Sequence, residues 1–355
     1  MTTILQMRKI LTIIAIIIGT LLITTTNAVV LSSLYTAKIP VTSRAAGQQT
    51  QALSQALKDV LIKVSGNANI ANINEITNAV KNPNSYIRDF SYISTSDNTD
   101  TPLLLQVSLI PKSIDNLLNQ AEQPIWKKNR PLVLIWLVTQ DNSGPQLQND
   151  GNSPTIKLLT GDANQRGLPI MFPMLDLTDL QQIQPTDVWA PFIKVIQNAS
   201  LRYSPNAILI IRIDQSNPNN LVSHWSLLIK NDQLSWDING NDMQTIVQNG
   251  INNITNIFVK KFAVIKNSQP ENMITLTVTN LKNVGDYAKI VHYLDGLAGV
   301  TNVEAQNITA SQASFNLTLN TDVDTLQRTI QLNSILSPLQ DQSQATSLTY
   351  KLSST

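Results

Sequence analysis

The chain has 355 residues, of which 42% are hydrophobic and 14% charged, and its formal net charge is +1. This length suffices for two or three hydrophobic cores, and the composition is typical of a folded chain. A net charge so close to zero argues against nucleic acid as a partner. The absence of cysteine excludes disulfides, thiolate catalysis and zinc–thiolate sites. The two histidines, His224 and His292, are too few for a histidine-based metal cluster, so we expect no cofactor.

The first 28 residues have the pattern of an export signal. Arg8 and Lys9 precede an apolar run over residues 10–23, and small residues lead to Ala28, after which cleavage is expected. Cleavage removes two basic residues and no acid, which changes the net charge from +1 to −1. The alternative is an uncleaved anchor in the inner membrane, which is the one membrane contact that the sequence predicts. We therefore expect an exported, periplasmic bacterial protein.

Residues 29–125 predict an N-terminal α+β domain. Apolar residues recur at helical spacing from Leu53 to Val64, Ser43 is an expected N-cap, and Gly66 suits the left-handed position after the helix. The expected elements, in chain order, are a strand over 31–41, this helix, a short helix over 73–80 that ends before Pro83, a strand over 86–93, a polar loop over 95–101 and a strand over 103–109.

Residues 126–268 predict a middle α/β domain with a mixed sheet, because apolar strands alternate with helices. The expected elements are a strand over 132–138, a polar loop over 141–154, a strand over 168–175, a helix over 187–203, strands over 207–213, 225–229 and 234–238, and a helix over 243–258. Pro169 and Pro173 make the 168–175 strand an edge or irregular strand.

Residues 269–355 predict a third domain with the element order β-α-β-β-α-β. Asn283 begins its first helix as an N-cap, and Gly299 is expected to end that helix. This order is that of the ferredoxin-like fold. The fold class expected for the whole chain is thus α/β and α+β, as successive small modules with a C-terminal ferredoxin-like βαββαβ domain.

Five stretches of the chain resemble an uncharacterised exported proteobacterial family, domain of unknown function two-zero-six-six. They are Ala52–Gly66, Asn129–Leu137, Arg166–Ile170, Pro173–Asp179 and Asp187–Tyr203. The resemblance implies export but no activity, cofactor or substrate, because that family has none assigned.

Asp176, Asp179 and Asp187, together with His224, form the one group that suggests hydrolytic or metal chemistry. Asp176 and Asp179 follow a predicted strand, where α/β folds place ligand groups. Their spacing matches no calcium loop, however, and carboxylates before a helix are ordinarily caps. We therefore expect them to be structural.

A short basic segment joins the first two predicted domains. Trp126, Lys127, Lys128 and Arg130 suggest a docking patch, although so few charges are more typical of a solvated linker. The five tryptophans stand at alternating or helical positions, which favours core packing over a ligand groove.

We therefore expect no enzyme, because no catalytic constellation is recognisable. The preferred hypothesis is a non-catalytic periplasmic protein that binds other envelope proteins and supports their assembly or maintenance. One alternative is a metal-dependent hydrolase that uses Asp176, Asp179 and His224. The other is a carrier of a small apolar ligand, with a closed pocket lined by Trp189 or Trp225.

Overall fold

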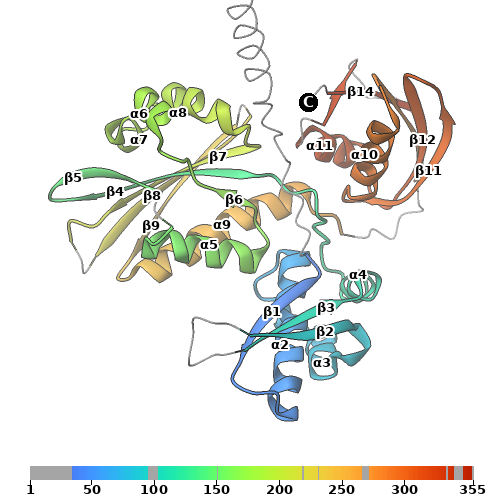
Figure 1. Cartoon of the computed structure of the whole chain (residues 1–355), viewed down its shortest axis with the longest axis horizontal. Helices are drawn as coiled ribbons and strands as arrows, with labels where there is room; N and C mark the ends of the chain where they lie inside the picture. Colours follow the sequence, from blue (N-terminus) through green and yellow to red (C-terminus); the bar gives the residue numbers. More distant parts are fainter. Residues whose placement is uncertain are drawn as a thin grey trace, which may run out of the picture. The chain divides into compact units, whose positions relative to one another are not determined.

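The computed structural model describes residues 34–94, 103–149, 151–217, 220–230, 232–265, 272–332, 335–339 and 347–353. The predicted signal segment, with Ala28, and the loop over 95–101 lie outside these residues. The described part is a mixed α/β protein with three sheets and ten α-helices (Figure 1). None of its helices is long and apolar enough to cross a membrane.

The first sheet is antiparallel with the strand order β1-β3-β2, and three helices contribute to its core. Its elements are β1 (Thr36–Val41), α2 (Ala46–Ser65), α3 (Asn74–Lys81), β2 (Ile87–Ser94), β3 (Leu103–Leu109) and α4 (Pro111–Gln120). Helix α2 buries its apolar face and is followed by Gly66 at a φ of 66°, as predicted. Ser43 is not its N-cap; Ala45 holds that position, and the Ser43 hydroxyl donates to Oε1 of Gln48 at 2.9 Å.

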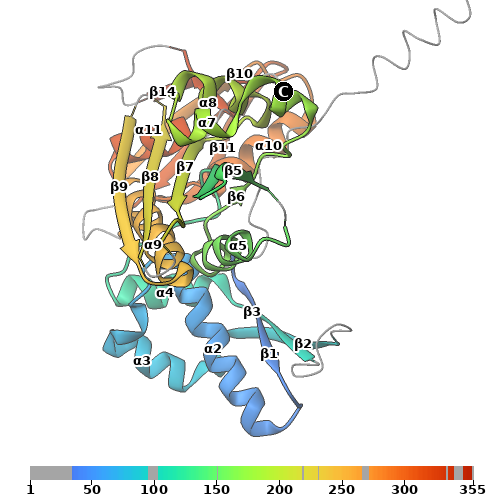
Figure 2. The ribbon, with the colours of Figure 1, turned by 90° about the vertical axis from the view of Figure 1, so that its left-hand side faces the viewer.

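The middle sheet has the order β5-β4-β7-β8-β9, with β6 beside β4, and is mixed as predicted. Its strands are β4 (Val133–Asp141), β5 (Gly144–Gln148), β6 (Ile170–Met171), β7 (Ala207–Asp214), β8 (Leu221–Ile229) and β9 (Asp232–Gly240). Its helices are α5 (Pro154–Arg166), α6 (Leu177–Gln182), α7 (Pro185–Trp189), α8 (Ile193–Ser200) and α9 (Met243–Phe262). Helices α5 and α9 cover one face, and α6 to α8 cover the other (Figures 1 and 2). Strand β4 is buried on both faces, which explains its continuous apolar run.

The chain between β4 and β7 differs most from expectation. The expected loop over 141–154 contains β5, which pairs with β4, and α5 follows where no helix was predicted. The expected strand over 168–175 shrinks to β6, because Pro169 and Pro173 have no N–H to donate. The expected helix over 187–203 is divided into α7 and α8 at Pro191 for the same reason.

The third sheet has the order β11-β12-β10-β14-β13, in which β10 and β14 are parallel neighbours. Its elements are β10 (Asn272–Thr279), α10 (Val284–Asp295), β11 (Val300–Ile308), β12 (Gln312–Leu319), α11 (Val323–Leu332), β13 (Leu336–Pro338) and β14 (Ser347–Leu352). Asn283 caps α10 as predicted, accepting from the backbone N–H of Asp286 at 3.0 Å. The helix ends at Gly296 rather than Gly299, which lies in the following turn at a φ of 86°. The ferredoxin-like assignment stays a prediction.

Candidate functional site

Two acidic residues at the start of α6 are bound to one arginine from the end of the α8 region. Arg202 donates to both carboxylate oxygens of Asp176, at 2.7 and 2.9 Å, and to Oδ1 of Asp179 at 3.0 Å. Asp176 is also the N-cap of α6 and accepts from two backbone N–H groups. The bidentate geometry fixes the start of α6 against Arg202.

Asp179 lies in the interior of this cluster, with 1% of its surface exposed. Its Oδ2 accepts from the backbone N–H of Leu175 at 2.9 Å and from the hydroxyl of Tyr203. The Tyr203 oxygen in turn accepts from the backbone N–H of Met174 at 2.9 Å. We call Asp176, Asp179, Arg202 and Tyr203 the clamp, because they tie the chain before α6 to the chain after α8.

The pKa values within the clamp reflect these bonds. Hydrogen bonding to Arg202 lowers the pKa of Asp176 to about 2, and the same pairing raises the pKa of Arg202. Burial, with the hydrogen bond to Asp179, raises the pKa of Tyr203 to about 12. The Asp176 carboxylate, the Arg202 guanidinium and the neutral Tyr203 phenol are therefore kept in these protonation states near neutral pH.

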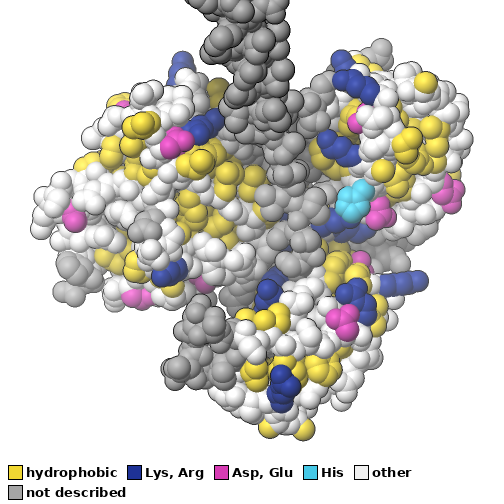
Figure 3. Space-filling model, in the orientation of Figure 1, with side chains coloured by type: hydrophobic (Ala, Val, Ile, Leu, Met, Phe, Trp, Pro, Cys, Tyr) yellow, Lys and Arg dark blue, Asp and Glu magenta, His cyan; other side chains and the backbone are white. Residues whose placement is uncertain are grey.

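Large apolar side chains in and beside the α6 to α8 helices face solvent. They are Met174, Leu177, Leu180, Phe192 and Leu201, with exposed fractions of 61, 78, 44, 55 and 73%. Leu177 and Leu201 directly follow and precede the ion-paired residues Asp176 and Arg202, so both lie beside one ion pair. Figure 3 shows hydrophobic side chains on the surface over the α6 to α8 region. We call these five residues the α6–α8 patch.

The structure does not gather the predicted acidic residues and histidine into one site. His224 on β8 hydrogen-bonds through Nδ1 to Asp237 of β9 at 2.6 Å, and Asp187 accepts from the backbone N–H of Gln184 at 2.8 Å. No group of three or more histidines and acidic residues in the described ranges could hold a metal ion. The side chains proposed for a metal-dependent hydrolase are thus held by other partners: Arg202 for Asp176 and Asp179, and Asp237 for His224.

The basic segment is largely internal, contrary to a docking patch. Trp126 and Arg130 are 1 and 4% exposed, and Lys127 is half-buried, donating to the carbonyl of Val300 at 2.9 Å. The Nζ atom of Lys128 lies 3.3 Å from Nε2 of His292. Arg130 holds the segment inward by donating to backbone carbonyls near the ends of α2 and α5.

Arg130 binds backbone carbonyls from both the first and the middle sheet regions. Its guanidinium donates to Lys63 at 2.7 Å, Gly167 at 2.7 Å, Arg166 at 3.5 Å, Lys127 at 3.0 Å and Trp126, and it lies 4.1 Å over the Trp126 ring. Lys63 and Arg166 lie in the last turns of α2 and α5, where helix carbonyls carry partial negative charge. Burial nevertheless lowers the pKa of Arg130, to about 9.

Arg166 makes the reciprocal contacts and is also 4% exposed. It donates to the carbonyl of Gly66 at 2.6 Å and to the side-chain oxygens of Asn252 and of Asn256, the latter at 3.2 Å. Burial lowers its pKa to about 10. We call the contact of α2 with α5 and α9, including Arg130 and Arg166, the seam.

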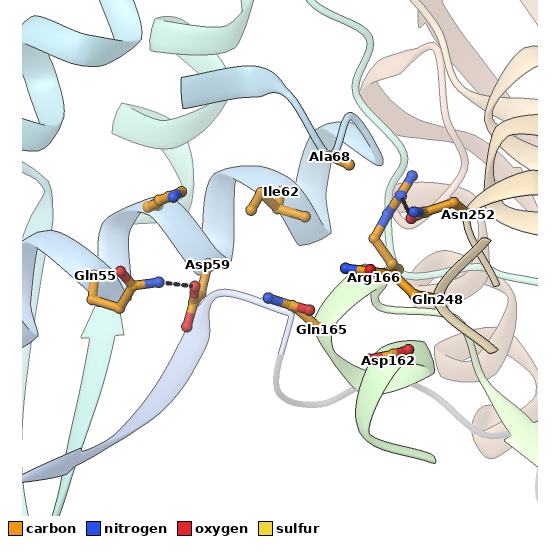
Figure 4. A pocket seen from close by; sticks show the side chains of 10 residues that line it. Gln55, Asp59, Ile62, Ala68, Asp162, Gln165, Arg166, Gln248 and Asn252 are labelled. Carbon is orange, nitrogen blue, oxygen red and sulfur yellow. Dashed lines mark hydrogen bonds between the residues drawn. The ribbon is translucent and has the colours of Figure 1, made fainter. Parts of the chain in front are cut away.

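The seam contains a polar pocket of about 180 Å³ (Figure 4). It is lined by Gln55, Lys58, Asp59, Ile62, Ala68, Asp162, Gln165, Arg166, Gln248 and Asn252. Burial raises the pKa values of Asp59 and Asp162. Neither Trp189 nor Trp225 lines this pocket, so it is not the apolar pocket that a carrier would need.

The tryptophans predicted to pack in the core do so at three positions. Trp126, Trp136 and Trp225 are at most 1% exposed. Trp225 packs against α9 so closely that a Cβ atom at Gly250 would lie 2.2 Å from its ring.

The residues that sequence reasoning missed are Arg202, Tyr203 and Arg166, together with the α6–α8 patch. Arg202 and Tyr203 are more than twenty residues from Asp176 and Asp179 in the chain, and no spacing rule connects them. Leu177 and Leu180 resemble core residues in sequence, since a spacing of three residues is typical of a buried helix face.

The first region of the chain is similar to a known family model. Residues 28–127 match the family model described as "Domain of unknown function (DUF8605)", and these residues include the whole first core. The resemblance to domain of unknown function two-zero-six-six was therefore wrong, since the matching model is a different one. Ala52–Gly66, one of the stretches that suggested it, is an amphipathic helix end with a glycine cap, a pattern that many folds share.

No curated protein matches the chain. A solved structure titled "Crystal structure of uncharacterized protein" is similar at 12% identity, covering 37% of this chain and 91% of its own, with a TM-score of 0.17. A TM-score so low establishes no common fold, and nothing about function follows from it.

Proposed function

We propose that this chain is a non-catalytic, exported protein of the bacterial envelope that binds another protein through the α6–α8 patch. The observation that carries the proposal is the exposure of five large apolar side chains in one segment of the chain, residues 174–201, four of them within two residues of a clamp residue. Single exposed apolar residues are ordinary on protein surfaces, but contiguous ones are typical of interaction sites.

The frame beneath the patch supports binding. Leu177 and Leu201 lie next to Asp176 and Arg202, whose bidentate pair fixes both backbones. Ile183, Val188 and Ile196 anchor the same short helices in the core. Apolar anchors that are held before binding lose little conformational entropy on association, and such residues supply most of the energy of an interface.

The charges of this region favour an uncharged partner surface. Within residues 174–203 three acids, Asp176, Asp179 and Asp187, oppose two bases, Lys194 and Arg202, and the clamp pairs two of the acids with Arg202. Anionic lipid headgroups are not attracted by such a surface. We therefore propose an apolar, near-neutral protein surface as the partner, with affinity that depends little on salt.

We further propose that the C-terminal module is ferredoxin-like. The supporting observation is the order β11-β12-β10-β14, which places the first and last strands of a βαββαβ unit side by side in parallel, with β13 added at the edge. This fold hosts many functions and does not choose one.

Photo-crosslinking in cells tests the binding proposal. A photoreactive amino acid is placed at Leu177 or Leu201 of the tagged, full-length chain, and at Val284 as the control. Val284 is 82% exposed and apolar but lies on α10, away from the patch residues in sequence and sheet. We expect both patch positions to capture the same envelope protein and Val284 to capture none. Equal capture from all three positions, or no capture from the patch, would contradict the proposal.

Export is tested on the same tagged chain. Fractionation should recover it from the periplasm, and sequencing of its N-terminus should begin at Val29, after Ala28. Recovery from the membrane with Met1 intact supports the anchored alternative, in which residues 10–23 hold the chain in the inner membrane. Recovery from the cytoplasm would contradict export.

A further inference from the structure

The polar pocket in the seam is separate from the α6–α8 patch and is built from three helix faces. Gln55, Asp59 and Ile62 lie on one face of α2, Asp162, Gln165 and Arg166 on one face of α5, and Gln248 and Asn252 on one face of α9 (Figure 4). Helices that pack together ordinarily present apolar residues to each other. Eight of the ten lining residues here are instead polar or charged.

The hydrogen bonds already present fix which atoms remain available in the pocket. Gln55 donates its amide to Oδ1 of Asp59 at 2.7 Å, which leaves Oδ2 of Asp59 as an acceptor. Arg166 donates to the side-chain oxygen of Asn252, which leaves the Asn252 NH₂ group as a donor. Gln165 and Gln248 make no side-chain hydrogen bond to the described residues, and each offers both a donor and an acceptor. The pocket therefore mixes donors and acceptors within a small space.

The charges of the lining balance. Lys58 and Arg166 oppose Asp59 and Asp162, and the guanidinium of Arg166 is committed to Gly66, Asn252 and Asn256. Its Nε is buried and has no partner among the described residues. A ligand with a strong net charge would therefore meet both attraction and repulsion, whereas a neutral one meets neither.

We propose that this pocket binds a small, neutral, polyhydroxylated molecule, such as a monosaccharide or a cyclic polyol. Each hydroxyl group donates one hydrogen bond and accepts others, so it can donate to a carboxylate on one side and accept from an amide NH₂ on the other. Of the ten lining residues, Ile62 and Ala68 alone are apolar, which is too little apolar surface to bind a mainly hydrophobic ligand. A volume of about 180 Å³ is well above the roughly 10–15 Å³ that one water needs, so a molecule of several linked heavy atoms, such as one sugar ring, has room to enter.

Calorimetry on the mature full-length chain tests the proposal with defined probes. The neutral probes are glucose, galactose, mannose and myo-inositol. Glucosamine and glucuronate keep the glucose ring but add a positive or a negative charge, and triglycine offers amide groups without hydroxyls. We expect saturable binding of at least one neutral probe, with the charged sugars and triglycine binding more weakly than that probe.

Matched variants locate the binding. Gln165→Leu and Gln248→Leu each remove a lining amide that makes no hydrogen bond to the described residues, so the fold should tolerate them. We expect each to weaken binding about fivefold or more. Gln197→Leu, on the exposed side of α8, is the control and should leave binding unchanged. Absence of saturable binding by every neutral probe, tighter binding of a charged sugar or of triglycine, or binding unaffected by both lining variants would each overturn the proposal.

Discussion

Arginine side chains organise both the seam and the clamp, but they bind neutral oxygens in the seam and carboxylates in the clamp. Arg130 and Arg166 in the seam are 4% exposed and bind backbone carbonyls and asparagine side chains. Arg202 in the clamp has a side chain that is 33% exposed and binds two carboxylates. Among these three arginines, the two without a carboxylate partner are buried and the ion-paired one lies near solvent.

The difference teaches how a buried cation is stabilised without an opposite charge. A guanidinium has five N–H donors, and removing it from water is costly when they lack acceptors. The carbonyls at the ends of α2 and α5 supply both acceptors and the negative ends of two helix dipoles. In the clamp, by contrast, the Arg202–Asp176 pair is partly solvated, and solvated ion pairs contribute little to stability. We therefore expect the seam to determine stability and the clamp to determine local geometry.

Replacing each arginine by methionine tests this contrast with the largest expected effect. Arg130→Met leaves several buried carbonyls without a donor, and we expect the free energy of unfolding to fall by about 3 kcal/mol or more. Arg202→Met is the matched variant, and we expect a clearly smaller loss because Asp179 keeps its hydrogen bonds from Leu175 and Tyr203. Urea denaturation followed by far-ultraviolet circular dichroism measures both. Equal losses for the two variants would break the contrast.

A second pair of variants tests how tightly the seam is packed. Gly66 and Gly144 both have positive φ, but a Cβ atom at Gly66 would lie 2.2 Å from Cγ2 of Val259, whereas Gly144 has open space around it. Gly144→Ala should cost about 1 kcal/mol, from backbone strain alone. Gly66→Ala adds a steric clash, and we expect a loss of about 2 kcal/mol or more. A smaller loss of stability at Gly66 than at Gly144 would show that Val259 can move aside at little energetic cost.

The sequence predicted best those elements whose pattern is complete within one segment. Helix α2 has regular apolar spacing and a glycine after its end, and β4 has an unbroken apolar run because both its faces are buried. Helix α5 was missed because its seam-facing residues are polar, so its apolar residues Ile156, Leu159 and Ala163 form a weak periodic pattern. Helix α4 buries only three apolar residues after Pro111 and was missed for a similar reason.

The candidate sites depend on contacts between distant segments, which local patterns do not encode. Asp176 and Asp179 were expected to be caps or solvated charges, and Asp176 does cap α6, but the partner Arg202 is brought to them by tertiary packing. Arg130 was expected at the surface because arginine is rarely buried. Its carbonyl acceptors belong to the ends of α2 and α5, which meet only in the folded chain.

Acid titration should affect the two regions in opposite directions. The folded pKa of Asp176 is about 2, below the ordinary value near 4, so the unfolded chain binds more protons between these values. The clamp's stabilisation is therefore complete above about pH 4 and is lost as the pH falls towards about 2. In the seam, the pKa values of Asp59 and Asp162 are raised above the ordinary value near 4. Between the raised and the ordinary value the folded chain binds more protons than the unfolded chain, so stability rises as the pH falls through this interval.

Two variants separate these contributions to the pH dependence of unfolding. Asp59→Asn should reduce the gain in urea midpoint on mild acidification, and Asp176→Asn should reduce the loss at lower pH. Both effects should be smaller than that of Arg130→Met, because each concerns one partly solvated carboxyl group. A mild-acid gain that survives Asp59→Asn and Asp162→Asn together would show that the seam carboxyls are not its source.

The smallest effect on stability is expected at the α6–α8 patch. Leu177→Gln and Leu201→Gln replace side chains that are 78 and 73% exposed, so the free energy of unfolding should change by no more than about 0.5 kcal/mol. The clamp beneath them keeps all its partners, since neither leucine contributes a side-chain hydrogen bond to it. If the patch is a binding surface, the same two variants should lower partner capture by about tenfold or more. Loss of stability comparable to that of Arg202→Met would instead mean that these leucines support the fold, and the contrast between a stabilising seam and a binding patch would fail.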